Sequence, residues 1–277
     1  MGEPMAQRLL DAGYPLTVYN RTIEKTRNLR QNGAVAASTP QEAVEQTDVS
    51  IIMLADYPAI ENIFFKDPMS RDTWKNKTLI MMSTITPDES LKIKEHIIQR
   101  GGEYLEAPVL GSIPAVQAGT LLIFTGGTHT QSQKWDHLLS EFSTDRFYMG
   151  ETGKATAVKL AINQLAIAQT TAFSMSLGYV REAGVDVNTF MEIIKKSAYH
   201  SPGLERKAGT LMKRDYSTIR FPLKLMLKDL DLMIHQFSAA GIDTSALKGT
   251  RKVLQKGIDD GNGDRDSLTV YETIHPV

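Results

Sequence analysis

The chain has 277 residues, of which 42% are hydrophobic and 23% charged, and its 31 basic and 32 acidic residues leave a formal net charge of -1. This balance excludes a general electrostatic attraction to nucleic acid or to an anionic membrane. The lack of cysteine excludes disulfides and thiolate chemistry. No apolar run reaches the ~18 residues of a membrane span. We therefore expect a globular, cytoplasmic protein of one large or two smaller domains, with neither nucleic acid nor membrane as a partner.

The N-terminal half alternates expected strands with expected helices, after an opening helix that ends at Gly13. Short apolar, β-branched runs predict strands at 15–19, 48–54, 78–82, 104–109 and 120–125. Helices are expected between them at 22–31, 40–46 and 87–101. Continuous apolar strands separated by helices are typical of a parallel sheet covered on both faces. The pattern therefore predicts a doubly wound α/β domain with its ligand crevice at the carboxyl ends of the strands.

The opening helix has no strand before it. In a Rossmann unit, a first strand and a glycine-rich turn precede this helix, and Gly2 stands where the last glycine of that turn would be. Two interpretations stay open. Met1 starts a peripheral helix, or the sequence begins inside a dinucleotide-binding fingerprint that lacks its first strand and G-x-G.

The C-terminal half changes character near Gly150, and no strand is expected beyond Thr152. Residues 154–181 predict one long helix, about 40 Å in length, which ends before Gly184. Further helices are expected at 187–197, 203–214, 223–240 and 245–257.

We therefore expect an α/β dinucleotide-binding domain over 1–150 and an all-helical domain over 151–277, joined by the long helix. The helical domain would serve substrate binding and dimerisation. The polar tail, 261–277, is expected to be only partly ordered.

Four segments, in order, carry a family resemblance. They are MGEPMAQRLLDAG at the start, EAPVLGS at 106–112, the pair GETG at 150–153 and KLAIN at 159–163, and FPL at 221–223 with KDL at 228–230. In these segments the chain resembles the β-hydroxyacid dehydrogenases, the family of 3-hydroxyisobutyrate dehydrogenase and 6-phosphogluconate dehydrogenase. It is most similar to the branch that reduces glyoxylate and succinic semialdehyde or oxidises 3-hydroxyisobutyrate.

The resemblance implies a Rossmann domain followed by an all-helical domain. It also implies hydride transfer between NAD(P)(H) and a small hydroxyacid, aldehyde or ketoacid that carries a carboxylate. The expected assembly is a homodimer or homotetramer formed through the helical domain.

Lys159 and Asn163 are the expected catalytic residues. Their i, i+4 spacing places them on one face of the long helix, with Cβ atoms ~5–6 Å apart, and we expect that face to line the interdomain cleft. Carbonyl reduction needs a proton donor for the alkoxide that hydride arrival creates, and an ammonium supplies both charge and proton. The resemblance makes Lys159 the general acid/base and lets Asn163 orient Lys159 or the substrate oxygen. From the residues alone, a solvated lysine with a polar neighbour is the alternative.

Asn20, Arg21 and Thr22 bear on cofactor choice, because an acidic residue at the end of the second Rossmann strand binds the ribose diol of NAD. Asn20 holds that place here, and the guanidinium of Arg21 beside it suits a 2′-phosphate. The sequence therefore favours NADP(H) over NAD(H), although an ordinary turn would use the same residues. The resemblance adds the further cofactor-binding residues Gly2, Leu54, Ala55, Thr84 and Lys228. For Thr84, a helix cap is the alternative.

The resemblance also predicts the residues beside the substrate. They are Leu110, Gly111, Ser112, Phe221 and Asp229. Leu110 departs from the family, which has a serine there to hold the substrate carboxylate. The leucine side chain cannot donate a hydrogen bond, so the backbone N–H groups of Gly111 and Ser112 would have to bind the substrate carboxylate instead. The alternatives are a core aromatic for Phe221 and a solvated ion pair for Lys228 and Asp229.

The six histidines show no metal-binding spacing, so we expect no metal.

A second hypothesis for the function is a catalytically impaired or truncated relative that acts as a non-enzymatic binding protein. The missing first strand and Leu110 favour it, whereas the presence of Lys159 and Asn163 favours an active enzyme. The sequence does not identify the substrate.

Overall fold

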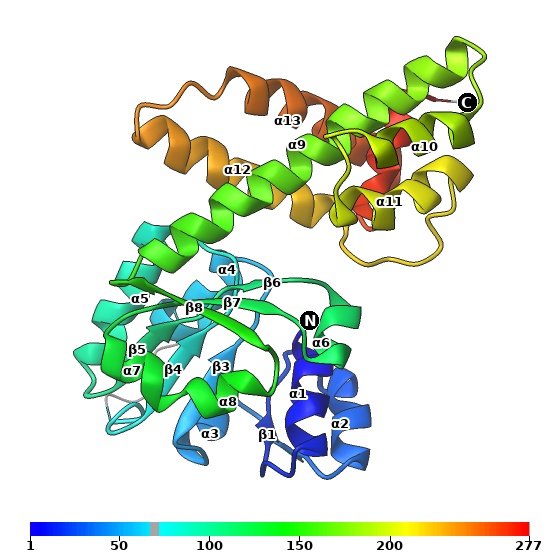
Figure 1. Cartoon of the computed structure of the whole chain (residues 1–277). Coiled ribbons are helices and arrows are strands. Elements are labelled where there is room, and N and C mark those ends of the chain that lie inside the picture. Colours follow the sequence, from blue (N-terminus) through cyan, green and yellow to red (C-terminus); the bar gives the residue numbers. More distant parts are fainter. Residues whose placement is uncertain (67–71, 277) are drawn as a thin grey trace. The chain divides into compact units, whose positions relative to one another are not determined.

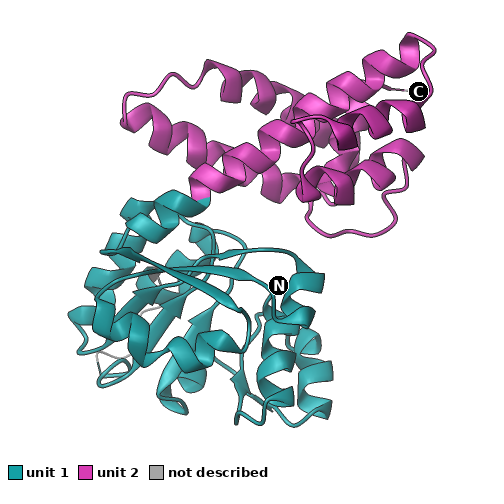
Figure 2. Ribbon diagram, in the orientation of Figure 1, with its two compact units in different colours: residues 1–159 teal, residues 160–277 magenta. Residues whose placement is uncertain are grey.

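The computed structural model describes residues 1–66 and 72–276, which divide into two compact units, Met1–Lys159 and Leu160–Val277 (Figure 2). The division falls inside the long helix α9 (Lys154–Glu182), so that one helix contributes to both units (Figure 1). Unit 1 is an α/β domain and unit 2 is helical, which confirms the predicted fold class.

Unit 1 contains two sheets of short strands. The strands are β1 (Thr17–Val18), β2 (Val35–Ala36), β3 (Val49–Ile52), β4 (Thr78–Met81), β5 (Glu103–Glu106), β6 (Val109–Leu110), β7 (Leu122–Gly126) and β8 (Asp145–Gly150). β1 and β2 form a parallel pair, and the other six form the second sheet in the order β3-β4-β5-β7-β6, with β8 beside β7. Each predicted strand occurs, but β2 and β8 were not predicted.

The larger sheet is parallel-rich rather than wholly parallel. β3, β4 and β5 run parallel to one another, and β7 runs antiparallel to β5 and β6. A parallel connection needs a crossover of about a dozen or more residues. Residues 111–121 between β6 and β7, which hold only the short helix Ile113–Ala118, are fewer than that. The chain therefore returns as an antiparallel strand, a reversal that the apolar pattern did not show.

Helices cover this sheet on both faces. The helical elements of unit 1 are α1 (Gly2–Asp11), η1 (Ile23–Thr26), α2 (Arg27–Gln31), α3 (Pro40–Glu45), α4 (Tyr57–Glu61), η2 (Asn62–Lys66), α5 (Pro87–Ile98), α6 (Ile113–Ala118), α7 (His129–Lys134) and α8 (Asp136–Ser140). Successive β4 residues point to opposite faces, and Leu79 packs with Ile93 of α5 whereas Ile80 packs in the core that contains Met5 of α1. This two-faced burial is why β4 appears in the sequence as a continuous apolar run.

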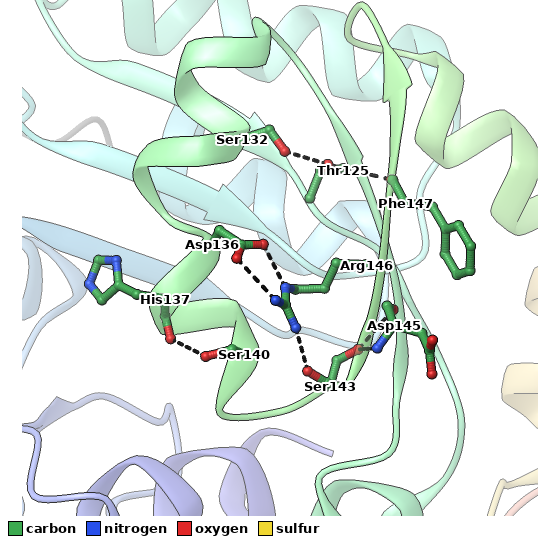
Figure 3. A network of polar contacts seen from close by, with 9 residues as sticks. All are labelled: Thr125, Ser132, Asp136, His137, Ser140, Ser143, Asp145, Arg146 and Phe147. Carbon is green, nitrogen blue, oxygen red and sulfur yellow. Dashed lines mark hydrogen bonds and ion pairs between the residues drawn. The ribbon is translucent and has the colours of Figure 1, made fainter.

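β8 is held by a polar network rather than by apolar burial (Figure 3). The Arg146 guanidinium donates two hydrogen bonds to the Asp136 carboxylate, at 2.6 and 3.0 Å, and one to the backbone oxygen of Ser143, at 2.6 Å. The strand thereby ties to α8, while Phe147 and Tyr148 stay exposed. No residue of β8 is fully buried, so its sequence lacks the alternation of apolar and polar residues by which half-exposed strands are predicted, and the strand was missed.

Unit 2 matches the prediction closely. Its helical elements are the second part of α9, α10 (Val187–Lys196), α11 (Pro202–Lys213), α12 (Leu223–Ala239), α13 (Ser245–Gly257), η3 (Ile258–Asn262), η4 (Ser267–Thr269) and α14 (Val270–Ile274). The long helix and the four helices predicted after it agree with observed helices to within one residue at each end. In the described chain, no helix is both long and apolar enough to cross a membrane.

The prediction of a partly ordered tail is wrong. Residues 266–271 are buried, and α14 packs within the two apolar cores of unit 2. The buried Asp266 carboxylate accepts hydrogen bonds from the backbone N–H groups of Arg220, at 2.7 Å, and Leu268, at 3.0 Å. The contact with Arg220 joins the tail to a segment more than forty residues away, so the polarity of the tail did not indicate whether it is ordered.

Candidate active site

The loops that follow β3 and β4 lie side by side in unit 1. The backbone N–H of Leu54 donates a hydrogen bond to the hydroxyl of Ser83, at 2.8 Å. Gly2 lies against the same place, because a Cβ atom on it would stand 3.7 Å from the carbonyl oxygen of Met53. The structure therefore brings together the segments of Gly2, Leu54 and Thr84, three of the predicted cofactor residues.

Ala55 and Thr84 occupy the same two loops. Ala55 is exposed, directly after Leu54. The cap of α5 is Thr86, whose hydroxyl accepts from the Glu89 N–H at 3.2 Å while Glu89 bonds back to the Thr86 N–H. The helix-cap alternative for Thr84 therefore does not apply.

Asn20, Arg21 and Thr22 form an exposed turn after β1. The side-chain oxygen of Asn20 accepts a hydrogen bond from the Thr22 N–H at 2.9 Å, as in an ordinary Asx turn. Within the described residues, Arg21 forms no ion pair with a carboxylate. An accessible guanidinium with no acidic side chain in the turn fits a 2′-phosphate, so the turn and the phosphate interpretation are compatible.

Leu110, Gly111 and Ser112 lead from β6 into α6. Gly111 has a φ of +143°, and a Cβ atom there would come within 2.5 Å of the Leu121 side chain, so that only glycine fits. Ser112 is the N-cap residue that precedes α6, but its hydroxyl makes no capping hydrogen bond. The backbone of this turn is therefore fixed by sterics rather than by the serine side chain.

Lys159 lies in the second turn of α9 and is only 8% exposed. The alternative of a solvated surface lysine therefore does not describe it. A lysine rarely occupies such a buried position without a structural or functional reason.

Glu106 was missed as a site residue. It ends β5, is fully buried and points its carboxylate at the start of α9. One oxygen accepts hydrogen bonds from the backbone N–H groups of Gly153, at 2.9 Å, and Ala155, at 2.8 Å. The other accepts from the hydroxyls of Ser90, at 2.7 Å, and Thr156, at 3.3 Å. The sequence offered two signals for Glu106, its place within an expected strand and its place at the start of the EAPVLGS segment that carries the family resemblance.

The Ser90 hydroxyl continues this network to Tyr104, whose phenol oxygen lies 2.7 Å away. Burial raises the pKa of Tyr104 far above its ordinary value, with the nearby Glu106 carboxylate acting in the same direction. The phenol therefore stays neutral, and the Glu106 carboxylate has hydrogen-bonding partners on both α5 and α9.

A second group of predicted residues lies in unit 2. The Asn163 amide nitrogen donates a hydrogen bond to Oδ2 of Asp229 at 2.9 Å, and the Lys228 ammonium lies 2.7 Å from Oδ1 of the same carboxylate. Asp229 is buried and Lys228 is mostly so. This cluster is therefore not a solvated ion pair, and Asp229 orients the Asn163 side chain.

Phe221 stands apart from the apolar cores of unit 2. Its side chain is 36% exposed, so it is not a core aromatic. Its backbone is fixed by the tail, because the Ser267 N–H donates to the Phe221 carbonyl at 2.7 Å. The ring is thereby presented on a rigid segment that precedes α12.

Among the described residues, no three His, Asp or Glu side chains gather closely enough to hold a metal ion.

Both halves of the chain match families of known function. Residues 1–150 match the family described as the NAD binding domain of 6-phosphogluconate dehydrogenase. Residues 153–274 match the family described as the NAD-binding domain of NADP-dependent 3-hydroxyisobutyrate dehydrogenase.

Three similar proteins match this chain along nearly their whole length. An uncharacterized oxidoreductase, YfjR, of Bacillus subtilis is 34% identical, over 99% of this chain and 96% of that protein. Glyoxylate/succinic semialdehyde reductase 1 of Arabidopsis thaliana is 29% identical, over 99% and 95%. The solved structure of 3-hydroxyisobutyrate dehydrogenase from Mycobacterium tuberculosis has a TM-score of 0.87 at 20% identity, over 99% of this chain and 95% of that one, which shows a shared fold.

Proposed function

Because the chain belongs to the β-hydroxyacid dehydrogenase family, that of 3-hydroxyisobutyrate dehydrogenase, we propose that it transfers hydride between NADP(H) and a small carboxylate-bearing aldehyde, ketoacid or hydroxyacid. Bound NADPH would supply the hydride. Lys159 would donate the proton that converts the resulting alkoxide to an alcohol, and would accept it in the reverse direction. The observation that carries this proposal is the burial of Lys159 in the early turns of α9.

The proposed role of Asn163 can be assigned to one atom of its side-chain amide. Since Asp229 holds the amide nitrogen, the amide oxygen is the atom left to accept a hydrogen bond from Lys159 or from a substrate hydroxyl. The Lys228 ammonium, 2.7 Å from Oδ1 of Asp229, helps to hold that carboxylate in place. We propose that this cluster orients the substrate, with the exposed ring of Phe221 and the turn at Leu110, Gly111 and Ser112 as further substrate contacts.

The proposal is tested by following NADPH consumption with glyoxylate, succinic semialdehyde and methylmalonate semialdehyde as substrates. We expect turnover with at least one of these short aldehydes. NADPH binding without turnover on any of them would instead support the non-enzymatic alternative, which the similarity to a reductase does not favour.

Cofactor preference is expected to depend on Arg21. The Arg21→Ala variant should bind NADPH roughly tenfold or more weakly, because a charge-assisted contact to the 2′-phosphate is lost, and should bind NADH almost unchanged. Fluorescence titration with both cofactors measures this. Arg30→Ala removes another exposed arginine nearby in the sequence and is the control. Equal weakening of both cofactors by Arg21→Ala would exclude phosphate recognition by this residue.

We also propose that unit 2 forms a homodimer through one face of α9. Apolar residues recur along that face at 3.5-residue spacing, and they are Ala161, Leu165, Ala168, Ala172, Met175 and Tyr179. Leu165 is 66% and Tyr179 is 76% exposed. Such a stripe, with small residues that allow close approach, can pair with itself about a two-fold axis.

Leu165→Glu should therefore dissociate the protein into monomers, because the pairing would bury two uncompensated carboxylates. Sedimentation or light scattering measures the mass. The control is Lys196→Glu, a charge change at an exposed position on α10. An unchanged mass for Leu165→Glu would place the interface elsewhere.

A further inference from the structure

We propose that Glu106 is a positioning residue for Lys159, acting through the first turn of α9. The inference rests on the proposed role of Lys159 as proton donor. Glu106 itself would not touch substrate or cofactor, since its carboxylate oxygens are committed to the protein interior.

The anchoring contacts are unusually complete. The first N–H groups of a helix lack partners within the helix, and the Glu106 carboxylate accepts from two such groups, those of Gly153 and Ala155. It also accepts from the hydroxyl of Thr156 one residue further on. A negative charge at this end of a helix is stabilised by the helix dipole. The start of α9 is therefore fixed by a side chain from β5.

Unit 1 leaves a space for this carboxylate. A Cβ atom on Gly126 would lie 2.1 Å from Oε1 of Glu106, so β7 needs a glycine at the point where it pairs with Glu106. On the other side, Ser90 of α5 donates to Oε2 at 2.7 Å. The carboxylate is thus confined between β7, α5 and α9, so shortening or removing this side chain should displace the start of α9.

Lys159 lies within reach of this anchor along the helix. It is four residues beyond Ala155, which corresponds to about 6 Å along the axis. Side chains on a helix lean toward its N-terminus, so the lysine stem extends back along the anchored turn. A displacement of that turn moves the ammonium, and a misplacement of about 1 Å can cost roughly 100-fold in rate.

Glu106→Ala should lower kcat by roughly 10–100-fold and leave KM nearly unchanged. Glu106→Gln should restore turnover, because its amide oxygen can accept from both backbone N–H groups while the hydroxyls of Ser90 and Thr156 rotate to accept from its nitrogen. Glu103→Gln is the matched control, since this carboxylate of the same strand contacts Thr78 and Lys134 instead of α9. The turnover of each variant is divided by its folded fraction, which circular dichroism measures.

The decisive measurement is a double-mutant cycle with Lys159→Ala. If Glu106 acts through Lys159, Glu106→Ala should cause little further loss in the Lys159→Ala background. An equal, multiplicative loss in that background would overturn the inference and leave the proposed function standing. Near-normal turnover of Lys159→Ala itself would overturn both.

A readout independent of activity is amide hydrogen exchange at the start of α9. Exchange at Ala155 should accelerate in Glu106→Ala and stay slow in Glu106→Gln. If Glu106→Ala does not fold, Glu106→Asp takes its place, because it withdraws both oxygens from α9 by one methylene and keeps the charge. Unchanged exchange with unchanged kcat in the folded variant would reduce Glu106 to a packing role and refute the inference.

Discussion

Replacing Lys159 with alanine is expected to lower turnover by ~10²–10⁴-fold, the usual contribution of a positioned general acid. The substitution removes the ammonium that would protonate the alkoxide, and the buried site at 8% exposure gives bulk water poor access to replace it. The affinity for NADPH should change little, because the lysine is assigned to the substrate oxygen. Steady-state kinetics and fluorescence titration measure the two quantities separately.

Lys154→Ala provides the control for this experiment. Lys154 is the first residue of the same helix and is exposed, so its loss changes the charge of α9 without emptying the buried position. Its kcat should stay close to that of the unchanged protein. Comparable turnover in both variants would remove Lys159 from the mechanism.

The helices of unit 2 were predictable because their signals are local. Apolar residues recur at helical spacing along α12. The N-cap of α10 is Asp186, whose carboxylate accepts a hydrogen bond from the Thr189 N–H at 2.9 Å. Gly184, with a φ of +69°, follows the end of α9. Each signal lies within a few residues of the boundary that it sets, so the sequence alone contains it.

The strand β8 and the ordered tail were not predictable in the same way. β8 is fixed by the Arg146 contacts to α8, ten residues earlier, and its exposed aromatics resemble a loop. The tail contains only a few apolar residues among polar ones. It is held in place by distant partners, such as Arg214, which hydrogen-bonds to Glu272 of the tail from 58 residues away. Long-range contacts of this kind leave no periodic pattern in the chain.

The candidate site divides in the same way. Lys159 and Asn163 were found because their spacing on one helix and a family resemblance agree. The contacts that orient them were not found, because Asp229 is 66 residues from Asn163 and Glu106 is 47 residues from Gly153. The family resemblance, together with the spacing, therefore pointed to the groups proposed for the chemistry, whereas the residues that contact them could be identified only from the fold.

Tyr271 provides the test of the tail. Its side chain is fully buried in the apolar core that contains Phe173, Leu177 and Leu268. The Arg214 guanidinium lies 4.5 Å from the centre of the ring, and the His275 ring stacks on it at 5.7 Å. The ring thus joins α14 to α9 and α11, and a disordered tail could make none of these contacts.

Tyr271→Ala is therefore expected to lower the free energy of unfolding by ~3–5 kcal/mol, the usual cost of truncating a large buried aromatic to alanine. Against a total of about 5–15 kcal/mol for a typical protein, the loss should be plain in urea denaturation followed by circular dichroism. Tyr271→Phe is the matched control, because the phenol hydroxyl is buried without a hydrogen-bond partner among the described residues. Removing an unsatisfied hydroxyl should be neutral or stabilising. A Tyr271→Ala variant that unfolds at the same urea concentration as Tyr271→Phe would show that the tail adds nothing to the core of unit 2, and the original expectation of partial order would return.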